Sequence, residues 1–281
     1  MARKKFDILS LRKKKAEGEP ITMLTAYDFP TARLVDEAGV DTILVGDSAA
    51  NVVLGYDDTV PVTMDEMLVL VRAVRRGVHH AMLIGDMPFG SYNISHEQAI
   101  ANGVRFLKEG GCDAVKLEGG GKMIGVIRAL VEAGVPVVGH LGLLPQTAEM
   151  VGGHRVQGRT ADSAQKIIEE AQQIAAAGAW MIVLELIPDR VAQRVSQAVD
   201  IPTIGIGAGP YCDGQVLVLH DMLGVNESFS PKFLKKYAQL GPAIREAVQH
   251  YVEDVKARKY PGPEHSFGIE DAELVKIYGG Q

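Results

Sequence analysis

Cysteine is scarce in this chain, since only Cys112 and Cys212 occur among its 281 residues. Two thiols cannot build a disulfide framework, and thiols this far apart do not indicate a clustered thiol metal site. No apolar run reaches the roughly 18 residues that a membrane span needs, and no secretory signal peptide is visible. We therefore expect a soluble, cytoplasmic protein without a membrane partner.

Positive charge is also in short supply, because 29 Lys and Arg face 35 Asp and Glu and leave a net charge of -6. Phosphate binding needs a basic surface, so nucleic acid is not an expected partner. Internal repeats and low-complexity tracts are missing too. The chain is 47% hydrophobic, which at this length favours one large core over two small domains.

Five apolar stretches end on titratable side chains. They finish on Asp47, Asp86, Glu118, His140 and Glu185. One such ending is weak evidence for a functional site, because many parallel strands end on a polar residue. Five such endings in register indicate that the strand ends meet at one place. A (β/α)₈ barrel of the α/β class builds its active site from the C-terminal ends of its strands. We therefore predict a TIM barrel with an N-terminal helix and a C-terminal helical extension.

The predicted organisation is one domain over residues 1–281, with barrel strands between 21 and 225. The last strand is expected over 215–219, closing on His220 and Asp221, and Thr63 with Glu66 predicts the capped start of a helix over 64–76. We interpret the basic segment 1–20 as a solvated helix, capped by Asp7 and ended near Gly18, that covers the barrel floor. A targeting segment or a contact for an anionic partner is the alternative for these residues.

Residues 226–281 are predicted to form C-terminal helices and a tail. Ser230 and Pro231 favour a helix start, because serine caps helices and proline suits their first turn. A following helix has one apolar face, made by Ile244, Val248, Tyr251, Val252 and Val255. The tail up to Gln281 is expected to be loosely held.

Three loops are candidates for contact with a ligand. The loop 51–62 is long, and long loops in compact domains are usually functional, so we expect it to cover the site. The stretch 152–159 is glycine-rich and basic, as suits a mobile loop over an anion. The turn 205–209 carries Gly-x-Gly, but no helix obviously follows it, which favours a tight wall over a dinucleotide site.

Asp47, Asp86 and Glu118 are predicted to converge at the rim of the barrel. Three close carboxylates need a cation, and without a thiol cluster or His-x-x-x-His spacing Mg²⁺ is more plausible than Zn²⁺. Such a site leaves positions for a 2-oxo acid, whose keto and carboxylate oxygens chelate together, and the metal would stabilise an enolate.

The remaining rim groups suit the other steps of that chemistry. Lys116 can neutralise a substrate carboxylate, although an ordinary ion pair with Glu118 is about as plausible. His140 can donate to a substrate oxygen. Glu185 is a candidate base, because apolar neighbours would make its carboxylate more basic in a dry pocket. His140 remains a competitor for that role.

The chain resembles a known family, the ketopantoate (3-methyl-2-oxobutanoate) hydroxymethyltransferases, over nearly its whole length, from Thr25-Ala26-Tyr27-Asp28 to Glu264-His265-Ser266-Phe267. The matching stretches include Val45-Gly46-Asp47-Ser48, Val115-Lys116-Leu117-Glu118, Gly139-His140-Leu141-Gly142 and residues 86–89, 145–146, 156–159, 204–209 and 213–215. The resemblance implies a metal-dependent barrel of the phosphoenolpyruvate mutase/isocitrate lyase superfamily. It also implies hydroxymethyl transfer from 5,10-methylenetetrahydrofolate to 3-methyl-2-oxobutanoate in pantothenate and coenzyme A synthesis.

Matched motif by motif, the resemblance also implies roles for single residues. Asp47, Asp86 and Glu118 match the positions that bind one Mg²⁺ per subunit. The oxo-acid contacts match Asp47, Ser48, Asp86 and Lys116, and the proton acceptor matches Glu185. A homo-oligomer, often a decamer, is implied as well. The chain departs from some members at Ala49-Ala50 and in its longer tail after Phe267.

Two other functions compete with this interpretation. A carbon–carbon lyase or mutase of the same superfamily would use the same rim, but the Lys-Lys-Cys-Gly-His loop that those lyases share does not occur here. A non-catalytic binder of a metal-chelated oxo acid is the other alternative. Glu185 argues against it, since a binder has no use for an unpaired carboxylate beside its ligand.

Overall fold

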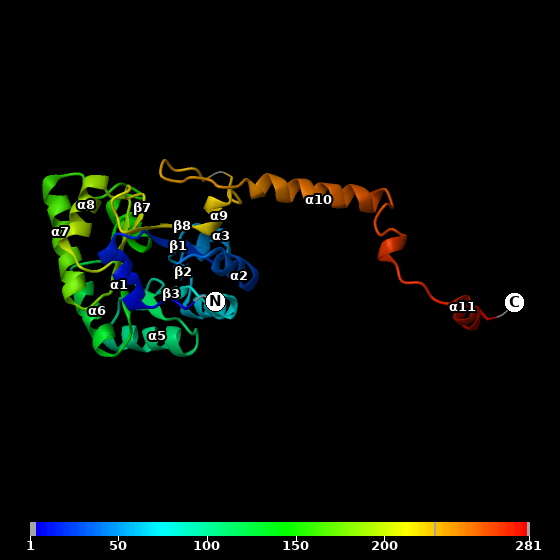
Figure 1. Ribbon diagram of the computed structural model, residues 1–281, viewed down its shortest axis with the longest axis horizontal. Helices are drawn as coiled ribbons and strands as arrows, with labels where there is room; N and C mark the ends of the chain where they lie inside the picture. The colour runs from blue at the N-terminus through cyan, green and yellow to red at the C-terminus, as the bar shows by residue number, and fades with distance from the viewer. Residues whose placement is uncertain (1–3, 228, 280–281) are drawn as a thin grey trace.

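Eight parallel strands close into a barrel in the computed structural model, which describes residues 4–227 and 229–279 (Figure 1). Neighbouring strands pair in chain order, and β8 pairs with β1 to complete the ring. The strands are β1 Ile21–Thr25, β2 Thr42–Val45, β3 Met82–Asp86, β4 Ala114–Lys116, β5 Val137–Gly142, β6 Met181–Glu185, β7 Thr203–Ile206 and β8 Gly214–Leu217. The prediction of a TIM barrel is confirmed.

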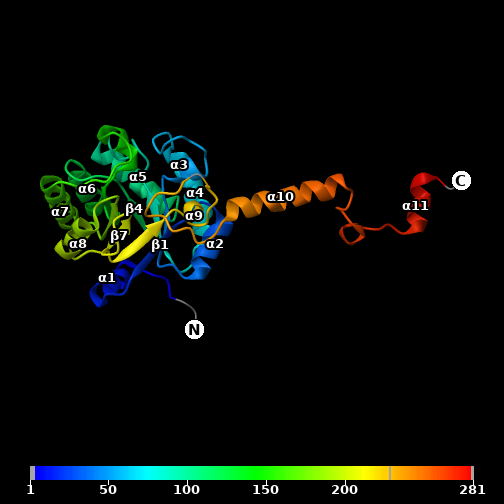
Figure 2. The same cartoon turned by 90° about the horizontal axis from the view of Figure 1, so that it is seen from above.

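Helices alternate with the strands and surround the barrel (Figures 1 and 2). They are α2 Phe29–Ala38, α3 Ala49–Val52, α4 Met64–Gly77, α5 His96–Lys108, α6 Met123–Glu132, α7 Ala161–Ala176, α8 Asp189–Ala198 and α9 Leu219–Met222, with a 3₁₀ segment, η1, at Pro145–Val151. Local signals set several ends. Thr63 and Glu66 form a capping box at the start of α4, and Gly39 ends α2 in the left-handed conformation.

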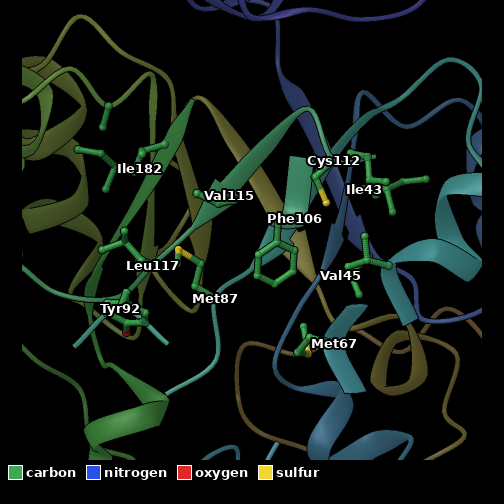
Figure 3. Close-up of a cluster of buried hydrophobic side chains, with 14 of the residues drawn as sticks. Ile43, Val45, Met67, Met87, Tyr92, Phe106, Cys112, Val115, Leu117 and Ile182 are labelled. Atoms are coloured by element: carbon green, nitrogen blue, oxygen red, sulfur yellow. The ribbon is translucent and has the colours of Figure 1, made fainter. Parts of the chain in front are cut away.

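The core has two layers, one inside the barrel and one between the barrel and its helices. Inward-facing strand residues such as Met82, Ile84 and Val183 fill the inside. The outer layer includes Phe106 and Cys112, which Figure 3 shows among their buried neighbours. Gly85 of β3 lies against them, and a Cβ there would sit 2.5 Å from Phe106 Cδ1. Because successive strand residues face opposite layers, the next inward positions reach the C-terminal rim.

The N-terminal helix α1, Ile8–Glu17, covers the floor of the barrel, as predicted. Asp7 caps it with a capping box, and Gly18 ends it. Leu11 is fully buried and packs against the inner layer of the barrel. Three lysines of the N-terminal segment pair with aspartates that precede the strands: Lys5 with Asp113, Lys14 with Asp41 and Lys15 with Asp213. Much of the positive charge of this segment is therefore paired with carboxylates on the barrel floor. Residues 1–3 of the predicted segment lie outside the described residues.

The end of the barrel differs from the prediction. We expected a last strand over residues 215–219, but β8 ends at Leu217, and His220 and Asp221 lie in the short helix α9. The helix expected at Ser230 and Pro231 is wrong as well. Pro231 accepts only a single turn-like bond from the Leu234 N–H before the chain extends along α9. Tyr237 and Leu240 then donate to the carbonyls of Met222 and Leu223, and these tertiary bonds replace a local helix.

The C-terminal helix α10, Leu240–Lys256, projects away from the barrel in both views (Figures 1 and 2). The predicted apolar face lies on it, but none of its residues is buried. Beyond it come η2, Pro263–His265, and α11, Asp271–Tyr278, while residues 280 and 281 of the predicted tail are outside the described part. Among the described residues, no helix has the length and apolar character needed to cross a membrane.

Candidate active site

A cavity of about 580 Å³ opens at the C-terminal ends of the strands. Every rim residue singled out from the sequence lines it: Asp47, Ser48, Asp86, Lys116, Glu118, His140 and Glu185. The period of two explains most of them. Asp86 continues the inward row of Met82 and Ile84, and Glu185 continues the row of Met181 and Val183. The strand ends do meet at one place.

The loops around the cavity only partly match the sequence interpretation. Asp57, Asp58 and Thr59 of the predicted loop 51–62 line the cavity, in keeping with its expected place over the site, whereas Asn51 lines it from the end of α3. From the basic stretch 152–159, only His154 reaches the lining. The glycine turn is a tight wall, because a Cβ at Gly209 would lie 2.3 Å from Asp189 Cβ.

An acidic group with one ammonium forms one side of the cavity. Asp86 Oδ1 lies 2.8 Å from Lys116 Nζ, and Asp86 Oδ2 accepts the Asp47 N–H at 3.0 Å. Burial raises the pKa of Asp86 to about 8; the Lys116 ammonium acts to lower this pKa, and the nearby carboxylates of Asp47 and Glu118 act to raise it. Burial acts to lower the pKa of Lys116, but the surrounding carboxylates outweigh it and raise that pKa. Negative charge is therefore in excess here.

His140 links this acidic side to Glu185. Its Nδ1 lies 3.3 Å from Glu118 Oε1, and its Nε2 lies 3.2 Å from Glu185 Oε2. Burial and the Lys116 ammonium act to lower the pKa of His140, yet hydrogen bonds with Glu118 and Glu185 outweigh them and raise it to about 9. The imidazole therefore stands between two carboxylates as a cation.

Glu185 is not in the dry, apolar pocket that its sequence neighbours suggested. Its side chain keeps 19% exposure and contacts His140, whereas the side chains of His140 and Glu118 keep only 3%. Leu184 and Ile187 are buried in the outer layer, and of the three apolar neighbours in the sequence only Leu186 lines the cavity with Glu185. The apolar flanks therefore surround the carboxylate only in part, and its position on the rim is what keeps Glu185 a candidate base.

Three further polar residues at the site had no role in the sequence analysis. Tyr27 follows β1, and its hydroxyl lies 2.8 Å from Ser48 Oγ. Gln146 is 3% exposed and donates its amide to Asp47 Oδ2 at 2.9 Å. Asp221 lines the cavity from α9, and its buried Oδ1 has no hydrogen-bond partner. Tyr27 and Gln146 stand within stretches that carried the resemblance, and that was the signal available for them.

The residues present fit a hard divalent cation, although not as three gathered ligands. Among the described residues, no group of three or more His, Cys, Asp and Glu side chains is placed to hold a metal ion. Mg²⁺, however, takes only one or two direct carboxylates and keeps several waters. Asp47, Asp86 and Glu118 supply buried carboxylate oxygens, which are the ligands that Mg²⁺ prefers. The Lys116 ammonium lies 2.8 Å from Asp86 Oδ1, and His140 Nδ1 lies 3.3 Å from Glu118 Oε1. A divalent cation would compensate the negative charge that these two groups leave.

Fold and site together define an enzyme built on a (β/α)₈ barrel, with its titratable groups at the C-terminal rim. The sequence model of the family described as ketopantoate hydroxymethyltransferase matches residues 5–263, so the chain belongs to this family. Membership confirms the resemblance found in the sequence, and it confirms that the chain is a hydroxymethyltransferase.

Relatives named 3-methyl-2-oxobutanoate hydroxymethyltransferase cover almost the whole chain. The protein from Heliobacterium modesticaldum is 54% identical over 275 residues, which is 98% of this chain and 99% of that one. The protein from Syntrophobacter fumaroxidans is 55% identical over 259 residues, or 92% of each chain. These identities span the barrel and its rim.

Solved structures with low sequence identity share the fold. A crystal structure of 2,3-dimethylmalate lyase, described as a member of the PEP mutase/isocitrate lyase superfamily, has a TM-score of 0.59 at 18% identity and covers 97% of this chain and 94% of its own. A phosphonopyruvate hydrolase has a TM-score of 0.61 at 14% identity, with 98% and 95% covered. The chain therefore shares its fold with these two proteins.

Proposed function

We propose that the enzyme transfers a hydroxymethyl group from 5,10-methylenetetrahydrofolate to 3-methyl-2-oxobutanoate and so forms 2-dehydropantoate for pantothenate and coenzyme A synthesis. The names of its relatives support the reaction class and the acceptor. The observation that carries the proposal is the placement of Glu185 in the same cavity as the Asp47, Asp86 and Lys116 group. The side of the cavity with Asp47, Asp86 and Lys116 suits the binding of an oxo acid, and Glu185 on the other side is available as a base.

The oxo acid is proposed to bind against Lys116 and Ser48. The Lys116 ammonium is buried among carboxylates and can bind the substrate carboxylate by charge. Ser48 can donate its proton to a substrate oxygen when the Tyr27 hydroxyl, 2.8 Å away, donates to Ser48 Oγ. Burial raises the pKa of Tyr27, which keeps that hydroxyl neutral. Both contacts hold the acceptor near the rim without taking up Glu185.

One Mg²⁺ per subunit is proposed to be held by Asp47 and Asp86, with Glu118 beside them. When bound, it would withdraw electron density from the keto carbonyl and make the neighbouring C3–H more acidic. Water cleaves the two C–N bonds of the donor's one-carbon unit, so that tetrahydrofolate leaves with an N–H at each nitrogen and the unit is at the oxidation level of formaldehyde. Glu185 takes the C3 proton, C3 forms the new bond to the carbon of that unit, and the oxygen of the unit takes the proton back from Glu185 to become the hydroxyl.

The folate donor is proposed to enter over the C-terminal side of the cavity. Phe229 and Phe233 line this side, and their rings suit a flat pterin. Asp221 offers a buried oxygen without a partner, which suits the N–H groups of that ring. Lys232 also lines the cavity and suits the carboxylates of the glutamate tail. The cavity is also larger than the small oxo acid alone requires.

A closed homo-oligomer is proposed as the working form, with the decamer of the resemblance as the expected size. The exposed apolar face of α10 supports it, because Val248 is 55% and Tyr251 58% exposed. The apolar run 67–71 on α4, a second candidate for a subunit contact, gives little support, since Met67, Leu68 and Val71 are in the core and Val69 is its one exposed residue. Light scattering of the wild type at micromolar concentration should exceed the monomer mass of 30.2 kDa. A monomeric mass would contradict the proposal.

A pair of substitutions tests which face of α10 makes the contact. Val248→Asp places a charge on the apolar face and should lower the assembly mass. Glu246→Gln, two positions earlier and about opposite on the helix, should leave it unchanged. Equal masses for Val248→Asp and the wild type would remove α10 from the interface.

The reaction is tested by following 3-methyl-2-oxobutanoate with and without the folate donor. Consumption that needs the donor and yields 2-dehydropantoate supports the proposal. Cleavage of a 2-hydroxy diacid such as 2,3-dimethylmalate without folate would instead indicate a lyase. Binding of the oxo acid without C3–H exchange or turnover would indicate a pure binding protein.

A further inference from the structure

Gln146 is an uncharged residue buried beneath the acidic side of the cavity, and the proposed chemistry does not use it. It lies in η1, Pro145–Val151, just after β5. Only 3% of its surface is exposed, so its polar atoms need partners within the protein. Those partners come from the ends of three other strands.

The side-chain amide of Gln146 has a fixed orientation. Its Nε2 donates to Asp47 Oδ2 at 2.9 Å and to the Met87 carbonyl at 3.0 Å. A carbonyl can only accept, so the nitrogen must face Met87 and the oxygen must point the other way. That oxygen accepts a bond of 2.6 Å from the Tyr92 hydroxyl. All the hydrogen-bonding capacity of the NH₂ group is therefore used.

The same residue also holds Glu118. The backbone N–H of Gln146 donates to Glu118 Oε2 at 3.1 Å. Tyr92 completes the link, because its hydroxyl accepts the backbone N–H of Glu118 at 3.3 Å while it donates to Gln146. Burial raises the pKa of Tyr92, so this hydroxyl keeps the proton that it donates.

We propose that Gln146 is a positioning residue that sets the places of Asp47 and Glu118 for a divalent cation; this inference rests on the metal dependence in the proposed function. With one oxygen held by a neutral donor, each carboxylate presents its other oxygen in a defined direction. The amide adds no charge to a site that already carries excess negative charge. Partners of this kind change metal affinity by about 10–100-fold when they are removed.

The test measures Mn²⁺ binding by calorimetry or by the electron paramagnetic resonance of free Mn²⁺, without substrate. Gln146→Met keeps the length of the side chain and should weaken binding by about 10–100-fold. Tyr92→Phe keeps the ring, removes the hydroxyl that orients the amide, and should weaken binding less but in the same direction. Gln98→Met is the matched control on α5, outside the cavity lining, and should bind as the wild type does.

Melting temperatures in chelator separate positioning from a general loss of stability. A merely structural role would lower the melting temperature of Gln146→Met and leave its Mn²⁺ affinity unchanged, and that result would overturn the inference. If Gln146→Met does not fold, wild-type affinity in Tyr92→Phe overturns it instead. If the wild type itself binds no Mn²⁺, both the proposed metal dependence and the proposed role of Gln146 are wrong. Weakened binding in the variants, with the wild type binding Mn²⁺, supports both.

Discussion

Replacement of Glu185 by glutamine isolates the proton-transfer step. The variant loses the basic carboxylate but keeps the size and most of the hydrogen bonding of the side chain. Glu185 Oε2 lies 3.2 Å from His140 Nε2, and a glutamine carbonyl can accept from the same nitrogen. We therefore expect Glu185→Gln to fold and to bind metal and oxo acid nearly as the wild type does.

The structure also sets the size of the expected effect. Both ring nitrogens of His140 face carboxylate oxygens, at 3.3 and 3.2 Å, so both carry protons and neither offers a lone pair. A positioned base contributes roughly 10²–10⁴-fold, or about 3–5 kcal/mol of activation free energy. Because Glu185 keeps 19% exposure, water can partly replace it in the variant. We expect a loss in the lower half of that range, about 10²–10³-fold.

The assay follows the exchange of the C3 hydrogen of 3-methyl-2-oxobutanoate for deuterium by NMR, in the absence of the folate donor. Donor binding and carbon transfer then play no part in the measured rate. His140→Asn is the companion variant, and it should retain faster exchange than Glu185→Gln. Exchange at the wild-type rate in Glu185→Gln, together with its loss in His140→Asn, would refute the reasoning and move the base to β5.

Three other predictions concern the metal, the cavity and the floor. Asp47→Asn or Asp86→Asn should abolish turnover in a folded protein, and chelator should inactivate the wild type reversibly; full wild-type activity in metal-free buffer would exclude the metal. Burial raises the pKa of Asp221 to about 6, whereas the unfolded carboxyl has its usual value near 4. The folded state therefore holds the extra proton between these values, so the contribution of Asp221 to stability falls as pH rises from about 4 to 6. In urea titrations the wild type should lose more stability over this range than Asp221→Asn does, and an equal change in both proteins would contradict the cause. Asp213→Ala removes a floor ion pair and should cost about 2–3 kcal/mol of unfolding free energy, while the exposed Asp200→Ala should cost far less in the same titration.

Much of the site could be predicted because its residues obey a local rule. A strand alternates its faces, and parallel strands of a barrel bring their C-terminal ends together. The last inward residue of a strand, as with Asp86 and Glu185, therefore reaches the cavity wherever the strand boundary is recognised. Apolar, β-branched runs showed where the strands lie and so predicted the fold class, although β8 ends at Leu217, earlier than expected. Local capping chemistry likewise located the start of α4 at Thr63.

The rest depends on contacts between distant parts of the chain, which local patterns do not encode. Gln146 meets Asp47 across 99 positions of sequence, and nothing near either residue announces the bond. Ser230 and Pro231 favour a helix start by local rules, but no helix forms there, because the residues that follow make hydrogen bonds to the end of α9 and the residue after it. The exposed face of α10 was visible as a pattern, but the same pattern also describes a buried helix, and only the structure shows that the barrel does not cover it.

The pairing of β1 with β8 also has a consequence for how the chain is made. The ion pair between Lys15 and Asp213, which lies beside this pairing, spans 198 positions of sequence. The first strand to leave the ribosome, β1, therefore cannot pair with β8 until nearly the whole barrel has been synthesised. Until residue 217 has emerged, β1 has an unpaired edge, and such edges recruit strands from other chains. A fragment that stops before β8 should therefore aggregate instead of forming a smaller barrel. The growing polypeptide needs protection over most of its synthesis, and ring closure by the eighth strand ends that need.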